Sequence, residues 1–275
     1  MKRILAVVAI FLFWNVSIVI PIFLLPAPSG VVVSLLFSGW VLHHFILRAG
    51  QPGEARRRAT LRIRPLQGEV LGWTLLFIPA VLAVSWALGE VYTGLVPVPP
   101  STLDPFGQLI DTPMGRLSAM VLAVGVAPVL EEFVFRGLLQ RPLERRWGPI
   151  WGITVTAAVF ALAHMLPWVF PLHFALGAAF GFAVYATRSI WAGVLLHAAN
   201  NTLAVLGLFG EKPVLSTPTI WQTGPTPTWW AAVALLLPAT LAAIWVGRRM
   251  LRAGRRRPTG RHFATSDLLI PHAPR

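Results

Sequence analysis

The sequence contains no cysteine, which excludes disulfide bonds, a thiolate nucleophile and cysteine ligands for a metal ion. Charged residues are also scarce, because they make up 12% of the 275 residues while 56% are hydrophobic. A typical soluble domain carries about 25% charged residues, so this composition argues against an ordinary soluble domain. It predicts an all-α, polytopic membrane protein, in which histidine, glutamate, aspartate, serine and asparagine must carry any chemistry.

Acidic residues are few, with 10 against 23 basic ones and a formal net charge of +13. Such an excess could attract nucleic acid, but the basic residues fall in short patches between apolar runs, as they do where charge orients a membrane protein. We therefore expect a lipid bilayer as partner and no nucleic acid. Arginine outnumbers lysine by 21 to 2, and this bias is typical of a GC-rich bacterial genome.

A membrane-spanning helix needs about 20 mostly apolar residues, and eight runs are candidates. The predicted spans are 4–25, 31–47, 70–96, 116–140, 149–166, 172–187, 190–209 and 229–247. The first run follows Lys2 and Arg3 like a signal peptide, but it is long and lacks a small-residue cleavage site, so we interpret it as a retained anchor. We expect residues 1–247 to form one transmembrane domain with its core at 116–209, and residues 248–275 to form a basic tail.

The positions of the basic residues predict the orientation, since cytoplasmic loops and tails are enriched in them. With both termini in the cytoplasm, 20 of the 23 basic residues lie on the cytoplasmic side. The exceptions are Arg116 and Lys212 outside and Arg136 within a span. We therefore predict an integral protein of the bacterial inner membrane. The arginines of residues 248–261 are expected to lie on anionic lipid headgroups, and residues 267–275 to be disordered.

Two adjacent glutamates and an arginine interrupt the fourth predicted span, in the stretch VLEEFVFRGLLQ. Glu131 lies ten residues before Arg141, or about 15 Å into the membrane, where a charge costs about 2.5 to 3.5 kcal/mol. Glu132 and Arg136 are four residues apart and are predicted to form an ion pair. Glu131 points about 100° away from Glu132 around the helix, so it needs another partner or a chemical role.

Candidate partners for Glu131 lie in the fifth and seventh predicted spans. Phe160 and His164 are four residues apart and share one helix face, as do His197 and Asn201. Counted from the predicted cytoplasmic ends of their spans, His164 lies about 22 Å deep, His197 about 11 Å and Asn201 about 17 Å. These depths bracket that of Glu131, which indicates one shared polar site inside the membrane.

Other intramembrane features have structural interpretations. Gly177 and Gly181 have the small-xxx-small spacing that lets membrane helices approach closely, so we expect them to serve packing. His173 is expected at the outer membrane interface, where the polar end of an imidazole can reach water. No internal repeat is apparent.

Three polar motifs follow one another between residues 131 and 201. They are Glu131-Glu132-x-x-x-Arg136, Phe160-x-x-x-His164 and His197-x-x-x-Asn201. Each motif is weak by itself, but the set in this order resembles that of the CPBP family, also called Abi or CAAX-protease and bacteriocin-processing proteins. This family includes the type II CAAX prenyl endopeptidases.

The resemblance implies an α-helical intramembrane endopeptidase whose polar cavity opens toward the cytoplasm. Position by position, it implies that Glu131 activates the attacking water with help from His164. It implies further that His197 and Asn201 stabilise the oxyanion. Membrane-associated or lipidated peptides are the implied substrates.

The same resemblance makes Arg136 and Phe160 supporting residues, and it gives Glu132 the task of fixing its helix, with a possible share in catalysis. General chemistry agrees with this interpretation, because peptide hydrolysis needs a base for water, donors for the oxyanion and an acid for the leaving amine. The three motifs supply carboxylate, imidazole and carboxamide groups. The sequence offers no serine beside an obvious base and no HExxH zinc motif.

Metal dependence stays open at the level of sequence. Glu131, His164 and His197 could form a His₂Glu zinc set with water as the fourth ligand, or the same residues could work without a metal. We favour the metal-free alternative, because side chains from three helices at uneven depths would have to converge on a tetrahedral geometry.

The main alternative function is a proton- or ion-coupled transporter that uses Glu131, Glu132 and His164 as a relay, since intramembrane carboxylates also mark such pathways. Secondary transporters usually have two related halves with interrupted helices, and the sequence shows neither feature. A scaffold that keeps the polar groups only for helix packing is disfavoured by the intact motifs. The sequence therefore predicts an endopeptidase.

Overall fold

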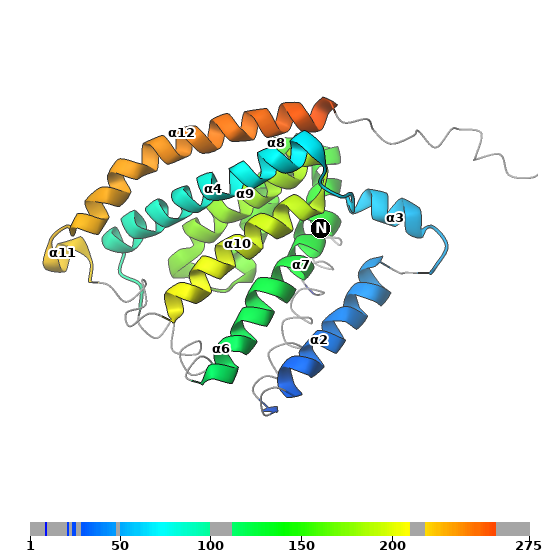
Figure 1. Cartoon of the computed structure of the whole chain (residues 1–275), viewed down its shortest axis with the longest axis horizontal. Helices are drawn as coiled ribbons and strands as arrows, with labels where there is room; N and C mark the ends of the chain where they lie inside the picture. Colours follow the sequence, from blue (N-terminus) through cyan, green and yellow to red (C-terminus); the bar gives the residue numbers. More distant parts are fainter. Residues whose placement is uncertain are drawn as a thin grey trace, which may run out of the picture.

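The computed structural model describes residues 29–47, 50–99, 112–209 and 218–256, with a few isolated positions before residue 29. Every regular element within these ranges is a helix, which confirms the predicted all-α fold (Figure 1). The first predicted span lies almost entirely outside the described residues. The end of the basic tail, beyond Arg256, lies outside them as well.

The helices include two short π-helical stretches on either side of the Glu131-Glu132 pair. In chain order the elements are α2 (Ser29–Val41), η1 (Leu42–Leu47), α3 (Glu54–Thr60), α4 (Gly68–Leu95), α6 (Pro113–Met120), η3 (Val121–Val126), α7 (Ala127–Glu132), η4 (Phe133–Gln140), α8 (Arg141–Ala163), η5 (Pro167–Val169), α9 (Phe170–Thr187), α10 (Ile190–Leu208), α11 (Ile220–Thr223) and α12 (Pro227–Arg256). Of these, η1, η3 and η4 are π-helical, and η3 and η4 flank α7 directly.

Among the described residues, five helical stretches are long and apolar enough to cross a membrane. They are Gly68–Leu95, Pro113–Ala163, Pro167–Thr187, Ile190–Gly207 and Pro227–Arg256. The chain is therefore a polytopic membrane protein, while the count of eight spans stays a prediction.

The 51-residue stretch Pro113–Ala163 contains the fourth predicted span and all but the last three residues of the fifth. It begins at Thr112, whose hydroxyl accepts a hydrogen bond from the backbone of Gly115 at 3.0 Å, with Pro113 at the first helical position. The stretch turns at Gly148, whose φ of 83° lies in the left-handed region that glycine adopts at no steric cost. Two helical segments therefore diverge from this point.

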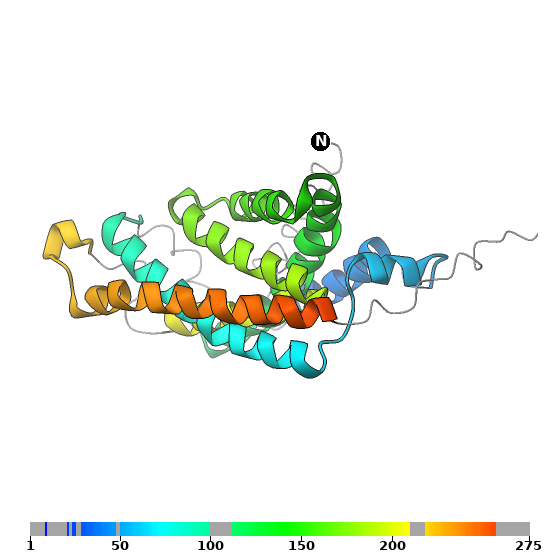
Figure 2. The ribbon, with the colours of Figure 1, turned by 90° about the horizontal axis from the view of Figure 1, so that it is seen from above.

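Helices α4 and α12 run side by side along one edge of the molecule in both views (Figures 1 and 2). Near its end α12 also approaches the end of α9, because a Cβ on Gly254 would lie only 1.9 Å from the carbonyl oxygen of Ala186. Met250 is fully buried in the same region. The helix thus continues through Arg256, and the face of its last turns that carries Met250, Ala253 and Gly254 packs against the bundle.

The centre of the bundle is the meeting point of η4, α8, α9 and α10. Aromatic rings from three of them fill it, with Phe135, Phe160 and Phe180 almost fully buried. A Cβ on Gly177 would lie 3.2 Å from the Cα of Ala157, so α8 and α9 approach closely there, as the small-xxx-small spacing predicts. This close approach brings the polar motif residues of the separate helices within reach of one another.

Candidate active site

Glu131 and Glu132 are the last two residues of α7, a single stretch of α-helix between the two π-helical segments. Pro128 contributes to this irregularity, because proline lacks the N–H that would bond to the carbonyl four residues earlier. π-Helical turns inside α-helices are rare and occur frequently at functional sites. Both carboxylates lie inside the protein, with Glu131 7% exposed and Glu132 0% exposed.

The predicted ion pair between Glu132 and Arg136 is present. Arg136 Nη1 lies 2.8 Å from Glu132 Oε1, and both side chains are fully buried. Arg136 Nη2 donates to the carbonyl oxygen of Gly177 at 3.0 Å, and the guanidinium lies 4.5 Å from the centre of the Phe160 ring. Charges are tolerated in such a place only when they are paired, so these contacts explain why an arginine stands inside an apolar helix.

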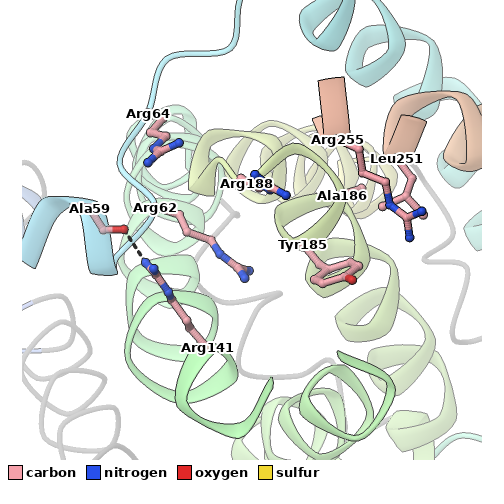
Figure 3. Close-up of a pocket in the computed structure, with 9 residues that line it drawn as sticks. All are labelled: Ala59, Arg62, Arg64, Arg141, Tyr185, Ala186, Arg188, Leu251 and Arg255. Atoms are coloured by element: carbon pink, nitrogen blue, oxygen red, sulfur yellow. Dashed lines mark hydrogen bonds between the residues drawn. The ribbon is translucent and has the colours of Figure 1, made fainter. Parts of the chain in front are cut away.

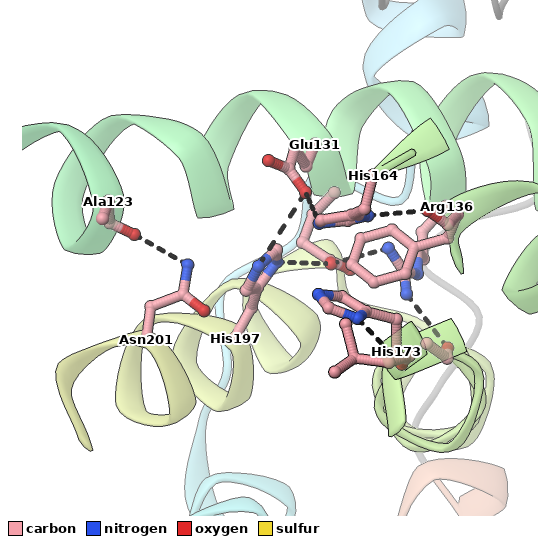
Figure 4. Close-up of polar contacts among 11 residues, drawn as sticks. Ala123, Glu131, Arg136, His164, His173, His197 and Asn201 are labelled. Carbon is pink, nitrogen blue, oxygen red and sulfur yellow. Dashed lines mark hydrogen bonds and ion pairs between the residues drawn. The ribbon is translucent and has the colours of Figure 1, made fainter. Parts of the chain in front are cut away.

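Glu131 faces the two motif histidines (Figure 4). Its Oε2 atom lies 3.9 Å from Nε2 of His164, at the end of α8, and 3.9 Å from Nε2 of His197, on α10. This oxygen is buried and has no hydrogen-bond partner in the described part of the chain. The structure therefore brings together a carboxylate and two imidazoles from three separate helices.

The far nitrogens of both imidazoles are occupied, which sets their orientation. His197 Nδ1 lies 3.1 Å from Glu132 Oε1, and His164 Nδ1 lies 2.8 Å from the carbonyl oxygen of Phe160. A carbonyl or carboxylate oxygen only accepts, so these contacts assign the proton to Nδ1 in each ring. In a neutral ring Nε2 is then an acceptor, and three acceptor atoms converge on a place that suits a small donor such as water.

Asn201 does not contact the Glu131 cluster. Its Nδ2 donates to the carbonyl oxygen of Ala123 in η3 at 2.8 Å, one turn along α10 from His197 (Figure 4). The shared face of His197 and Asn201 is thus as predicted, but the amide is bonded to the neighbouring helix. The predicted oxyanion role of Asn201 stays a prediction.

His173 is a neighbour of the site that sequence reasoning missed. Its ring centre lies 4.3 Å from that of His164, and its Nδ1 contacts the carbonyl oxygen of Val169 at 3.1 Å. The sequence signal was only a histidine near the start of the sixth predicted span. The predicted interfacial role did not anticipate that α9 places this ring against the motif histidine.

Gln140 extends the polar side of the motif helix toward the next turn. Its Nε2 donates to the carbonyl oxygen of Gly181 at 2.9 Å and to Glu144 Oε1 at 2.7 Å. Together with Glu132 and Arg136 these residues form a series at spacings of four, which keeps them on one side of the helix. This spacing is visible in the sequence. It places a continuous row of polar side chains along the contact between η4 and α9.

A metal ion is the one cofactor that the residues of this site suggest. The donor types suit zinc, because His164 and His197 hold their far nitrogens against oxygen atoms, as zinc-bound histidines do. Within the described ranges, however, no three His, Asp or Glu side chains are arranged as a group that could hold a metal ion. The residues do not form a ready metal site, so the chemistry below is derived from the side chains themselves.

Comparisons with known proteins point to the same motif region. Residues 113–203 match the family model "Type II CAAX prenyl endopeptidase Rce1-like". The "Membrane-embedded CAAX protease MroQ" of Staphylococcus aureus (strain USA300) is 26% identical over 157 residues, which cover 53% of this chain. The match spans 61% of the length of that relative. No solved structure matches significantly.

The family match agrees with the motif set, because residues 113–203 contain every motif position from Glu131 to Asn201. It also agrees with the apolar helices that carry these motifs. The resemblance predicted from the sequence is therefore confirmed as a resemblance: residues 113–203 are similar to the type II CAAX prenyl endopeptidase model, and part of the chain is similar to a CAAX protease.

Proposed function

We propose that the protein is an intramembrane endopeptidase that hydrolyses peptide bonds with water activated by glutamate and histidine. The observation that carries the proposal is the buried carboxylate of Glu131, which faces the Nε2 atoms of His164 and His197 at 3.9 Å each. The family model and the relative named as a CAAX protease support a peptidase. Neither bears on which residues act.

In the first step, Glu131 takes a proton from a water molecule that attacks the peptide carbonyl. The lone pair on Nε2 of His164 accepts the second hydrogen of this water, because its Nδ1 is held by the Phe160 carbonyl. The water is thereby held between two acceptors with its own lone pair free. The proposal needs no serine or cysteine nucleophile.

In the second step, the oxyanion of the tetrahedral intermediate is stabilised and the amine leaves. His197 serves this step in its doubly protonated form rather than as the neutral ring described above: Nε2 donates to the oxyanion, Nδ1 faces Glu132 Oε1 at 3.1 Å, and the ring keeps both protons throughout. Glu131 then delivers its proton to the departing nitrogen. Asn201 Nδ2 donates one hydrogen to the carbonyl of Ala123, which leaves its second hydrogen as a further donor for the oxyanion.

We propose membrane-associated or lipidated peptides as substrates, because the site lies between helices that are long enough to cross a membrane. The name of the relative includes the CAAX motif, but the bacterial origin that the codon bias indicates favours peptides without a prenyl group. We further propose the inner membrane as the location, with both termini in the cytoplasm, from the distribution of the basic residues.

Reconstituted protein tests this proposal against the transporter alternative. Purified chain in proteoliposomes receives a membrane-anchored peptide, with a pH-sensitive dye trapped inside. We expect cleavage of the peptide without a proton flux, and loss of cleavage in Glu131→Gln. If the parent shows no peptidase activity but carries a proton flux that Glu131→Gln abolishes, the same cluster serves proton transport and the peptidase proposal is wrong.

A further inference from the structure

A pocket of about 290 Å³ lies apart from the Glu131 site, where the ends of several helices meet (Figure 3). None of the described residues that line it is acidic, and more than half of them are arginines. The arginines are Arg62, Arg64, Arg141, Arg188 and Arg255. They come from four separate segments: the connection between α3 and α4, the start of α8, the α9–α10 turn and the end of α12.

Two of these arginines already have partners that hold them in the pocket wall. Arg62 forms a bidentate ion pair with Glu144, which lies one turn into α8. Arg141 donates to the carbonyl oxygens of Ala59 and Thr60 at the end of α3. These contacts fix the geometry of the wall, and only one carboxylate is involved in them.

The guanidinium groups of the other three arginines are available to contact an anionic ligand. The guanidinium groups of Arg64, Arg188 and Arg255 have no hydrogen bond or ion pair within the described part of the chain. Arg64 and Arg188 are half-buried, whereas Arg255 is exposed at the rim. Like charges repel when they are brought together, so an anionic ligand would relieve this repulsion.

The backbone around the pocket is locked in a specific shape. The backbone N–H of Ile190 donates to the carbonyl oxygen of Arg62 at 3.0 Å, and the hydroxyl of Ser189 donates to that of Arg64. Arg62 and Arg188 have φ values of 58° and 54°, which non-glycine residues seldom adopt. Only one other non-glycine residue in the described ranges has a positive φ. Such conformations persist only where surrounding contacts impose them.

We propose that this pocket binds a phosphate group, and that the phosphate is the headgroup of an anionic phospholipid. Guanidinium groups recognise phosphate oxygens through paired donors, and basic pockets between membrane helices bind such headgroups. The pocket lies at the ends of helices that are long and apolar enough to cross a membrane, where lipid headgroups are expected. The apolar side chain of Leu251 and the ring of Tyr185 line the same pocket and suit the glycerol and upper acyl part of a lipid.

The test compares two double variants: one removes two arginine charges from the pocket, and the matched control removes two arginine charges from exposed positions outside it. The pocket variant is Arg64→Ala with Arg255→Ala, and the control is Arg146→Ala with Arg252→Ala, at exposed positions outside the lining. Delipidated full-length protein in neutral detergent is titrated with phosphatidylglycerol, phosphatidylcholine or inorganic phosphate, and bound lipid is counted by native mass spectrometry.

We expect the parent and the control to bind phosphatidylglycerol in preference to phosphatidylcholine, and the pocket variant to bind phosphatidylglycerol about tenfold or more weakly. Equal binding by the pocket variant and the control would overturn the proposal. If inorganic phosphate binds to the parent as tightly as the lipid does, the pocket is a phosphate site, but the proposal that its ligand is a phospholipid headgroup is wrong. Because this assay measures lipid binding, its outcome is independent of peptidase activity.

Discussion

At the scale of single residues, the most informative side chain is Arg136. It is fully buried, yet it meets Glu132, the Gly177 carbonyl and the face of Phe160 at once. Such a residue is costly unless every contact is made, because a buried charge that loses its partner is left uncompensated. Arg136 therefore fixes the position of Glu132, which in turn orients His197.

Arg136→Met is expected to lower the free energy of unfolding by about 3 to 5 kcal/mol, since it leaves the Glu132 carboxylate buried without its cation. Unfolding of detergent-solubilised protein in a mixed-micelle titration, followed by circular dichroism, measures this loss. The double variant Glu132→Gln, Arg136→Met should recover part of it. A loss no larger than that of Arg146→Met at the exposed end of the helix would contradict the buried ion pair.

We expect activity without a metal ion, because the described residues form no group that could hold one and the proposed steps use side chains alone. Elemental analysis of active protein, combined with an assay in the presence of a chelator, checks this expectation. Cleavage should persist without stoichiometric zinc. Stoichiometric zinc that is lost together with activity would show that Glu131, His164 and His197 act as ligands instead.

Residue identities in the site could be read from the sequence, whereas the contacts of their polar ends could not. The four-residue spacing of Glu132 and Arg136 predicts their ion pair, and that pair is present. Spacing alone could not show that Asn201 bonds to the Ala123 carbonyl, since a shared helix face does not determine the partner on the neighbouring helix. The contact of His173 with His164 depends in the same way on how α9 is placed.

At the scale of helices, the site depends on the close approach of α10 to α7. A Cβ on Gly193 would lie 2.3 Å from Oε2 of Glu132 and 2.7 Å from Cγ2 of Val184. Neither group can move freely, because the carboxylate is buried in its ion pair and Val184 is buried in α9. Glycine at this position therefore lets Glu132 reach His197.

Gly193→Ala should displace Glu132, slow peptide cleavage and destabilise the fold by about 1 to 3 kcal/mol through overpacking. Gly207→Ala on the same helix is the matched control, because nothing lies within 4 Å of the added Cβ. The control should be neutral or slightly stabilising, since alanine favours helix more than glycine does. Equal activity in both variants would show that α10 and α7 are packed less tightly at Gly193 than the 2.3 Å approach to Glu132 Oε2 indicates.

Helix positions followed from hydropathy, but helix directions did not. The apolar runs at 70–96 and 190–209 correspond to α4 and α10 within two residues at each end. The depth count placed His164 deeper than Glu131, yet both histidines lie at the same distance from the carboxylate. The positive φ of Gly148 changes the direction of the chain before α8 reaches the site, and a count of residues along a straight helix contains no such turn.

At the scale of the whole molecule, the absence of cysteine makes the orientation directly measurable. We expect a membrane-impermeant thiol reagent to label Thr228→Cys, at the start of α12, from outside intact cells. Arg146→Cys should react only after the membrane is opened, because the positive patches are predicted to face the cytoplasm. Labelling of Arg146→Cys in intact cells would reverse the orientation and place the arginine pocket on the outer surface.

The most direct measurement of the proposed chemistry is the single-turnover rate of peptide cleavage in two matched variants. Glu131→Gln removes the proposed base, whereas Glu90→Gln removes a carboxylate from α4, another helix long enough to cross a membrane. We predict that Glu131→Gln slows cleavage by about 10² to 10⁴-fold or more with an unchanged circular dichroism spectrum, while Glu90→Gln cleaves like the parent. Cleavage by Glu131→Gln at the parental rate would show that the buried carboxylate between the two histidines is not the catalytic base.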